Sequence, residues 1–328
     1  MSGYVCKSPV LVCGFNRPDL LKNCLEHVRA VNPPRLYISI DGPRQNVKND
    51  AELVEQCREI ARSVTWCPDV KLKIEPVNLG CRKAMQSALD WFYDGEPEGI
   101  ILEDDIEATP AFFSFCDTML ERYRNDPTIA CVNGWTPVPE ELVPAELPYL
   151  TKYPHIWGWA TWRRAWQPSE KDAAAISLAS LRSGTLLTRS HGRGIDSFWW
   201  DRLKLIAHHG YDTWDVTFAL QTTAKGELAV SPPTPYSLNR GFGVSSTHTS
   251  RQRAEVSPRL ASELSMGVKT VPAVDLAKDL DWAHDKYHFG FGEGANYWPR
   301  LKSKIYYYLN IIPYGKSVIK AINRFRSS

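Results

Sequence analysis

The stretch Gly99-Ile100-Ile101-Leu102-Glu103-Asp104-Asp105 joins a short apolar run to three consecutive acids. An apolar run of this length, preceded by glycine, predicts a buried β-strand. The acids would then lie at the carboxyl end of the strand, where open α/β sheets bind their ligands. Adjacent half-buried carboxylates repel one another, and a divalent cation that also binds phosphate oxygens relieves that repulsion. The stretch therefore predicts a metal-bound diphosphate at a sheet edge, with a solvated acidic loop as the alternative.

Strands and helices alternate on both sides of this stretch. The predicted strands cover residues 9–15, 36–40, 70–74, 99–102 and 129–133. The predicted helices begin at Pro18, Asp50, Arg82 and Pro110. This rhythm predicts a doubly wound, mainly parallel α/β sheet flanked by helices.

The character of the sequence changes after the fifth predicted strand. Seven tryptophans lie between Trp157 and Trp214, and the sequence beyond about residue 250 is polar with a helical tail. We expect residues 1–135 to form the ligand-binding half of the sheet domain, 136–250 an aromatic-rich catalytic half, and 251–328 a C-terminal extension. The last thirty residues mix Tyr and Ile with Lys and Arg, which suits attachment to an anionic membrane surface. A C-terminal helix packed on its own domain is the alternative.

Composition excludes several classes of protein. The 328 residues carry a net charge of only +2, so we expect no nucleic-acid partner. All eight cysteines lie between Cys6 and Cys131 without a CxxC pair, which favours reduced, buried thiols. The chain shows neither a signal peptide, nor an apolar stretch of about twenty residues, nor a dinucleotide or Walker A fingerprint. We therefore expect a cytoplasmic protein, peripheral at most on the inner face of the membrane, that does not bind NAD.

Polar turns follow the first three predicted strands, at the same edge as the acids. The residues in these turns are Arg17, Asp41, Asn78, Gly80, Arg82 and Lys83. We expect the three basic side chains to meet phosphates and Asp41 to accept a hydrogen bond from a base or ribose. Asn78 and Gly80 would allow close backbone approach. Each residue alone is equally well explained by a turn or a solvated helix end, so the prediction rests on their convergence.

The segment Ile100-Ile-Leu-Glu103-Asp104-Asp105-Ile-Glu-Ala-Thr-Pro110-Ala-Phe-Phe113, with Arg17 and Asp41 after the first two strands, resembles the nucleotide-sugar domain of GT-A glycosyltransferases. The resemblance is closest to N-acetylglucosaminyltransferase I and extends to bacterial glycosyltransferase 2 type proteins. It covers residues 9–135 and reappears at Trp157-Gly-Trp159 and Trp214-Asp215.

The resemblance implies a role for each of these residues. Asp105 would bind Mn²⁺ or Mg²⁺, and Asp104 and Glu103 would contact the ribose and the donor sugar. Arg17 would lie near the diphosphate, and Asp41 would read the base. The implied donor is a nucleoside-diphosphate sugar, and the implied acceptor is a hydroxyl group of a glycan or glycolipid.

Transfer of a sugar also needs a base. The candidates in the aromatic half are Asp196, Asp201 and Asp215, and the resemblance points to Asp215. A helix N-cap is the alternative for Asp215, because an apolar-periodic segment begins directly after it.

Other residues of the same half are candidate contacts. Trp159 and Trp214 are candidate walls of the acceptor site, with core packing as the alternative. His248 is a candidate metal or phosphate ligand, with an exposed loop histidine as the alternative.

We thus expect a metal-dependent, inverting glycosyltransferase. A nucleotidyltransferase is one alternative, although the sequence shows no Gly-rich basic loop after the first strand to bind a triphosphate. A carbohydrate-binding protein without catalysis is the other, and it leaves the acids and basic turns without a role.

Overall fold

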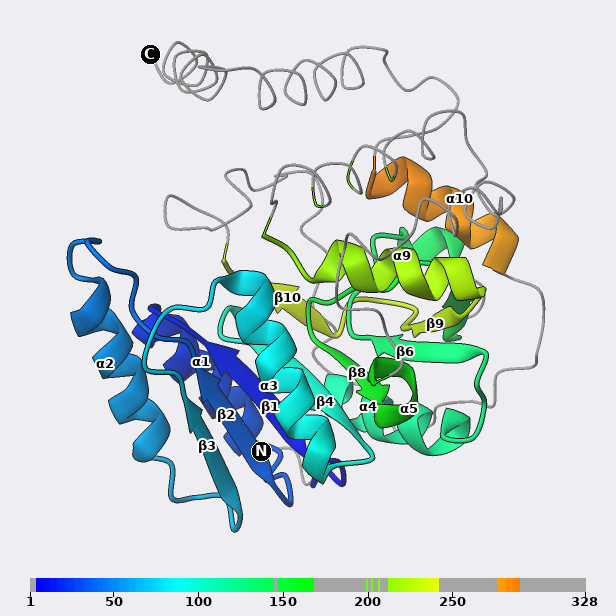
Figure 1. Ribbon diagram of the computed structural model, residues 1–328. Helices are drawn as coiled ribbons and strands as arrows, with labels where there is room; N and C mark the ends of the chain where they lie inside the picture. The colour runs from blue at the N-terminus through cyan, green and yellow to red at the C-terminus, as the bar shows by residue number, and fades with distance from the viewer. Residues whose placement is uncertain are drawn as a thin grey trace, which may run out of the picture.

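The computed structural model describes residues 4–143, 147–167, 199, 202, 206, 212–241 and 277–289 (Figure 1). The first elements are β1 (Val10–Gly14), α1 (Pro18–Arg29), β2 (Leu36–Ile40), α2 (Asp50–Arg62), β3 (Val70–Ile74), α3 (Cys81–Gly95) and β4 (Glu98–Glu103). They are followed by β5 (Ile106–Ala108), α4 (Pro110–Tyr123), β6 (Ile129–Asn133), a 3₁₀ helix (Glu140–Leu142), β7 (Tyr149–Thr151), β8 (Trp159–Trp162) and α5 (Arg163–Trp166). The last described elements are α9 (Asp215–Lys225), β9 (Leu228–Ser231), β10 (Ser237–Asn239) and α10 (Ala277–Tyr287).

Three predictions fall outside the described residues. They concern His248 as a ligand, Asp196 and Asp201 as candidate bases, and the C-terminal tail as a membrane anchor. Within the described part of the chain, no helix combines the length and apolar character needed to cross a membrane.

Local sequence explains where the helices begin. Both α1 and α4 start with proline, whose fixed φ suits the first helical position. In α4 the hydroxyl of Thr109 also accepts a hydrogen bond from the backbone N–H of Phe112 at 3.3 Å. Four apolar residues of α1 at helical spacing are buried against the sheet: Leu21, Cys24, Leu25 and Val28.

The main sheet has eight strands in the order β3-β2-β1-β4-β8-β6-β9-β7. The first four are parallel, and β6 is parallel to β9. The predicted mainly parallel α/β sheet is therefore confirmed. No local pattern predicted that β8, from the tryptophan-rich stretch, pairs antiparallel with both β4 and β6 in the middle of the sheet.

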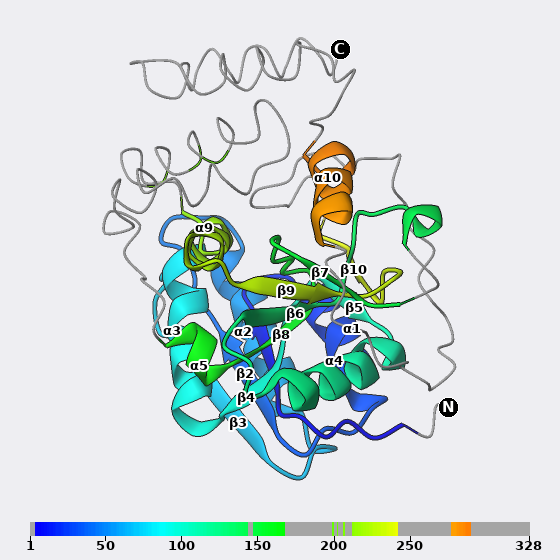
Figure 2. The same ribbon diagram turned by 90° about the vertical axis from the view of Figure 1, so that its right-hand side faces the viewer.

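Helices cover both faces of the sheet, as a doubly wound arrangement requires (Figure 2). Alternate residues of β1 point to opposite faces, so Val10 and Val12 belong to one core cluster and Leu11 and Cys13 to the other. The first cluster contains residues of α1, α2 and α4, and the second contains residues of α3, α5 and α9. The carboxyl ends of β1, β2 and β4 lie between these layers at one edge.

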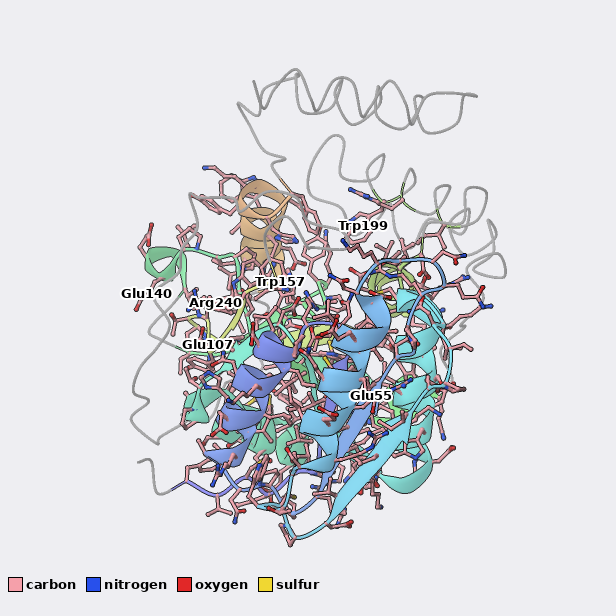
Figure 3. All side chains as sticks on the ribbon, turned by 90° about the vertical axis from the view of Figure 1, so that its left-hand side faces the viewer. Glu55, Glu107, Glu140, Trp157, Trp199 and Arg240 are labelled. Atoms are coloured by element: carbon pink, nitrogen blue, oxygen red, sulfur yellow. The ribbon has the colours of Figure 1, made fainter. Side chains whose placement is uncertain are left out.

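A small second sheet lies beside the acids. β10 pairs antiparallel with β5, the strand that directly follows Asp105. The backbone N–H of Arg240 donates to the carbonyl oxygen of Asp105 at 2.8 Å, and its side chain pairs with Glu107 at 2.5 Å (Figure 3). Residues about 135 positions apart in the chain are thereby held against the predicted site.

α10 packs against β7 through buried polar groups. Asp281 accepts hydrogen bonds from the Thr151 hydroxyl at 2.6 Å and from the Lys152 backbone at 3.1 Å. His284 lies 2.9 Å from both the Tyr149 hydroxyl and the His155 ring. These contacts fix the position of the helix, because each buried polar group has a specific partner.

Candidate active site

The three acids occupy the turn in which β4 ends. Glu103 is the last residue of the strand, and Asp104 and Asp105 form the turn into β5. The backbone N–H of Asp104 donates to the Cys13 carbonyl at 2.8 Å, and the backbone N–H of Phe15 donates to the Asp104 carboxylate at 3.2 Å. The turn is thus fixed to the carboxyl end of β1, as predicted from the strand pattern.

Arg17 joins β1 to α1 and binds both aspartates. Its guanidinium forms an ion pair with Asp104 and another with Asp105, at 2.8 Å from Oδ2 of Asp105. This is a charge-assisted pair of hydrogen bonds. The predicted convergence of Arg17 with the acids is present in the structure.

Burial and mutual repulsion raise the pKa values of Glu103 and Asp104. Burial, then Asp105, Asp104 and Asp215, raise the pKa of Glu103 well above its ordinary value, and Arg17 lowers it only in part. Burial also raises the pKa of Asp104, to about 6, against the opposing effect of Arg17. Perturbed carboxyl groups in a recess are typical of functional sites.

The environment of Asp105 fits a divalent cation. Its Oδ1 atom is buried and has no hydrogen-bond partner among the described residues, while Oδ2 binds Arg17. A buried, unsatisfied carboxylate oxygen is costly in the free protein and is a ready ligand for Mn²⁺ or Mg²⁺. No cluster of three or more His, Cys, Asp or Glu able to hold a metal exists in the described ranges.

Gly241 packs directly against the ion pair of Arg17 and Asp105. A Cβ atom at this position would lie 2.1 Å from Oδ2 of Asp105 and 2.9 Å from the Arg17 guanidinium.

Asp41 holds the turn after β3. Its carboxylate accepts hydrogen bonds from the backbone of Gly42 at 2.8 Å and Leu79 at 2.9 Å, and from the Asn78 amide at 2.8 Å. Burial raises the pKa of Asp41, and the backbone N–H groups oppose that rise. A Cβ at Gly42 would lie only 2.3 Å from the backbone of Val77, so this approach requires glycine. Base recognition by Asp41 stays a prediction.

A pocket of about 220 Å³ opens between these elements. It is lined by the predicted residues Arg17, Asp41, Asn78, Gly80, Glu103 and Asp104. Arg82 and Lys83 do not line it: Lys83 is exposed, and Arg82 contributes its backbone N–H to Asp212 at 3.1 Å. Their predicted phosphate contacts stay predictions.

Two pocket residues were missed by the sequence interpretation. Arg44, which lies over the Phe15 ring at 5.1 Å, lines the pocket near Asp41. Asp212 lines it near Gly80 and the start of α3. Asp212 stands three residues before the candidate base, and that proximity was the only signal in the sequence.

Asp215 is the first residue of α9 and accepts a hydrogen bond from the Thr213 hydroxyl. An acid in the first helical turn is favoured by the helix dipole, so this position is also good for stability. Its charge is among the causes that raise the pKa of both Glu103 and Cys81, which places it beside the acids. The structural and catalytic interpretations of Asp215 are compatible.

Trp159 and Trp214 belong to the core. Their exposed fractions are 1% and 3%, and their rings stack at a centroid distance of 5.4 Å. The prediction that they wall the acceptor site is wrong for these two rings, because Trp159 packs against Phe218 and Trp214 packs against Trp166 beneath the surface. Core packing, the alternative that the sequence left open, applies.

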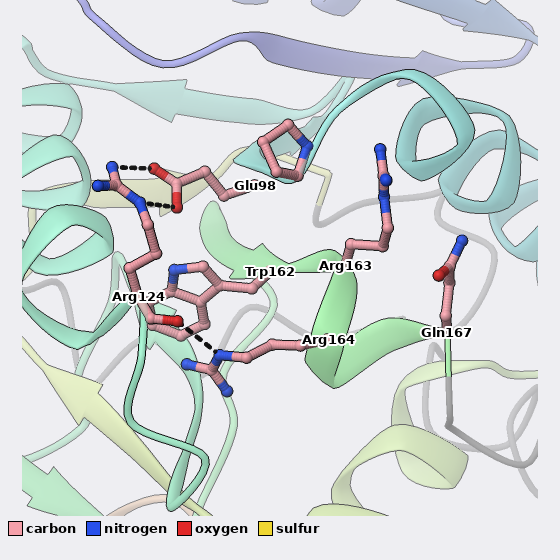
Figure 4. Close-up of a pocket in the computed structure, with 7 residues that line it drawn as sticks. Glu98, Arg124, Trp162, Arg163, Arg164 and Gln167 are labelled. Carbon is pink, nitrogen blue, oxygen red and sulfur yellow. Dashed lines mark hydrogen bonds and ion pairs between the residues drawn. The ribbon is translucent and has the colours of Figure 1, made fainter.

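A second pocket, of about 370 Å³, lies at the opposite end of β4 (Figure 4). Arg124 binds Glu98 there through two hydrogen bonds, of 2.9 and 2.8 Å. Arg163 donates to carbonyls at the end of α3, and Arg164 donates to carbonyls at the end of α4. These arginines cap helix C-termini, which is a structural role.

Comparison with known proteins identifies a family for most of the described sheet domain. A family model described as the GNT-I family matches residues 2–171, which is more than half of the chain. No curated protein matches the chain.

Three solved structures show distant likeness. Mouse xyloside xylosyltransferase 1 is 13% identical, with a TM-score of 0.35 over 68% of this chain and 84% of that one. A UDP-glucose pyrophosphorylase is 10% identical, with a TM-score of 0.31 over 69% and 89%. HddC from Yersinia pseudotuberculosis is 14% identical, with a TM-score of 0.26 over 38% of this chain, and the match spans 58% of the HddC chain.

Proposed function

The chain belongs to the GNT-I family, and on that premise we propose that it is a metal-dependent, inverting glycosyltransferase. It would move a sugar from a nucleoside-diphosphate sugar to a hydroxyl group of a glycan or glycolipid. The observation that carries the proposal is the meeting of Arg17, the three acids and Asp215 at the carboxyl edge of the sheet. These side chains could supply an anion-binding group, a cation ligand and a base.

The donor would bind in the pocket between β1, β2 and α3. Among the described residues that line this pocket, Arg17 is the basic residue that pairs with the acids. When the diphosphate binds, Arg17 would release a carboxylate and bind a phosphate oxygen instead. Asp105, with its unsatisfied Oδ1, would hold the cation. Bound Mn²⁺ or Mg²⁺ supplies positive charge that stabilises the departing nucleoside diphosphate.

Asp215 would act as the general base. It would take the proton of the acceptor hydroxyl while that oxygen forms a bond to the anomeric carbon and the bond to the diphosphate breaks. A displacement with one base inverts the anomeric centre, so an α-linked donor gives a β-linked product. A positioned base typically contributes about 10²- to 10⁴-fold in rate, or roughly 3 to 5 kcal/mol.

Incubation with Mn²⁺ and a panel of nucleotide sugars tests the proposal. Slow, metal-dependent hydrolysis of one donor, releasing a nucleoside diphosphate, is the expected result. A nucleotidyltransferase would instead release pyrophosphate from a nucleoside triphosphate and a sugar 1-phosphate. A protein that binds sugars but shows neither reaction would contradict both enzymatic assignments.

A further inference from the structure

Asp212 lies where the acceptor half of the chain touches the donor pocket. Its Oδ1 atom accepts a hydrogen bond from the backbone N–H of Arg82, in the first turn of α3. Its Oδ2 atom would lie 2.7 Å from a Cβ atom added at Gly80. Gly80 has a φ of +80°, a conformation that also favours glycine. The backbone before α3 is therefore shaped around this carboxylate.

The charged side chains that line the pocket differ in their partners. Arg17 pairs with Asp104 and Asp105. Glu103 and Asp212 line the same pocket, and among the described residues neither has a cationic side chain within ion-pair distance. After burial, the charges of Glu103, Asp215 and Asp212 raise the pKa of Cys81 and that of Arg17 lowers it, so all four lie within electrostatic range of the start of α3.

A diphosphate and a sugar suit different side chains of this pocket. The diphosphate would be attracted by Arg17 and repelled by Glu103 and Asp212, which have no cationic partner among the described residues. Sugar hydroxyls are neutral hydrogen-bond donors, and a carboxylate has about four acceptor positions, of which Asp212 uses one for Arg82. The sugar therefore suits the carboxylates that have no cationic partner.

We propose that Asp212 is a specificity-determining residue, whose carboxylate accepts a hydrogen bond from a ring hydroxyl of the donor sugar while Gly80 and the first turn of α3 hold it in place. This inference rests on the proposed function and extends it to the part of the donor that is transferred. A site built to bind a hydroxyl discriminates strongly against a sugar that lacks it.

The test is Asp212→Asn, with calorimetry of two ligands in Mn²⁺. Asparagine keeps an oxygen that accepts from Arg82 but loses the charge. The affinity for the nucleotide sugar should fall about tenfold, as expected for a lost hydrogen bond to a charged group, while the affinity for the nucleoside diphosphate alone stays unchanged. Gly80→Ala, which displaces the carboxylate, should produce the same selective loss.

Asp90→Asn is the matched control, because Asp90 accepts a hydrogen bond from Trp166 at 2.8 Å and lies on α3 outside the pocket. It should leave both affinities unchanged. If the wild-type protein binds no nucleotide sugar of the panel, the proposed function fails and this inference with it. If the wild type binds one and Asp212→Asn changes both ligands equally, changes neither, or raises only the acceptor KM, the role of Asp212 in reading the donor sugar is refuted.

Discussion

The two ends of β4 carry acids in opposite electrostatic conditions. At the amino end, Glu98 is bound by Arg124, and the preceding Glu96 receives two hydrogen bonds from Arg35, at 2.6 and 2.8 Å, and one from Tyr37. Burial alone would raise the pKa of Glu96, but the bonds from Arg35 and Tyr37 lower it below its ordinary value. At the carboxyl end, Glu103 has no such partner among the described residues, and its pKa is raised.

This difference separates stability from function along one strand. The amino end satisfies its charges with protein groups, so those charges contribute to folding. The carboxyl end leaves a carboxylate oxygen of Asp105 unsatisfied and holds Glu103 and Asp104 against repulsion. Unsatisfied oxygens and carboxylates that repel one another are expected where a bound ligand completes the site.

The largest effect is expected for Asp215→Asn. The substitution keeps the size of the side chain but removes the ability to accept a proton, so transfer to the acceptor should fall by at least about 10²-fold. Donor affinity should persist in calorimetry. Glu98→Gln, an acid-to-amide change at the other end of the sheet, should leave transfer unchanged. Retained anomeric configuration in the NMR spectrum of the product would contradict this mechanism.

Asp105→Ala should have the next largest effect. Metal-dependent binding of a nucleoside diphosphate should weaken by about tenfold or more, because the unsatisfied oxygen that would bind the cation is lost. Thermal unfolding should stay cooperative, since the residue lies in a turn at the sheet edge. An unchanged response to Mn²⁺ in calorimetry would remove Asp105 from the metal site.

Glu96→Gln should lower the free energy of unfolding by about 2 kcal/mol at pH 7, because a buried ionic hydrogen-bond network is broken. The lowered pKa of Glu96 means that its contribution is present above the ordinary value of 4.5 and is lost as the pH falls further. Denaturation curves of the variant and the wild type should therefore converge in acid. A constant difference from pH 3 to pH 8 would show that packing, rather than charge, is responsible.

Glu103→Gln should raise the free energy of unfolding, and its effect should be the smallest of the four. A raised pKa means that stability is lost as the pH rises from 4.5 toward the folded-state value, and glutamine removes that loss. The variant should therefore be more stable than the wild type at pH 6 and almost equally stable at pH 4. A destabilised variant at pH 6 would overturn the contrast between the two ends of β4.

Local patterns in the sequence predicted much of this structure. The strands at residues 36–40, 70–74 and 129–133 have the predicted bounds, and Arg17 meets the acids as expected. These features depend on apolar runs and on the shared edge of parallel strands, which are visible within a few residues.

The features that were missed depend on contacts between distant residues. The central position of β8 follows from pairing with β4 and β6, and the burial of Trp159 follows from that position. Asp212 reaches the pocket only because α9 packs beside α3. No local periodicity records which strand pairs with which, or which acid comes to face a pocket.

The placement of β8 also bears on how the chain is made. β4 and β6 are synthesised before Trp159–Trp162, yet the edge of β4 that faces away from β1 and the edge of β6 that faces away from β9 are paired only by that later strand. At about 5 to 20 residues per second, a nascent chain would carry both unpaired edges for roughly several seconds. Exposed edges pair readily with other chains. A polypeptide released from the ribosome before residue 159 should therefore aggregate rather than form a smaller stable sheet, and the nascent protein should engage chaperones during this interval.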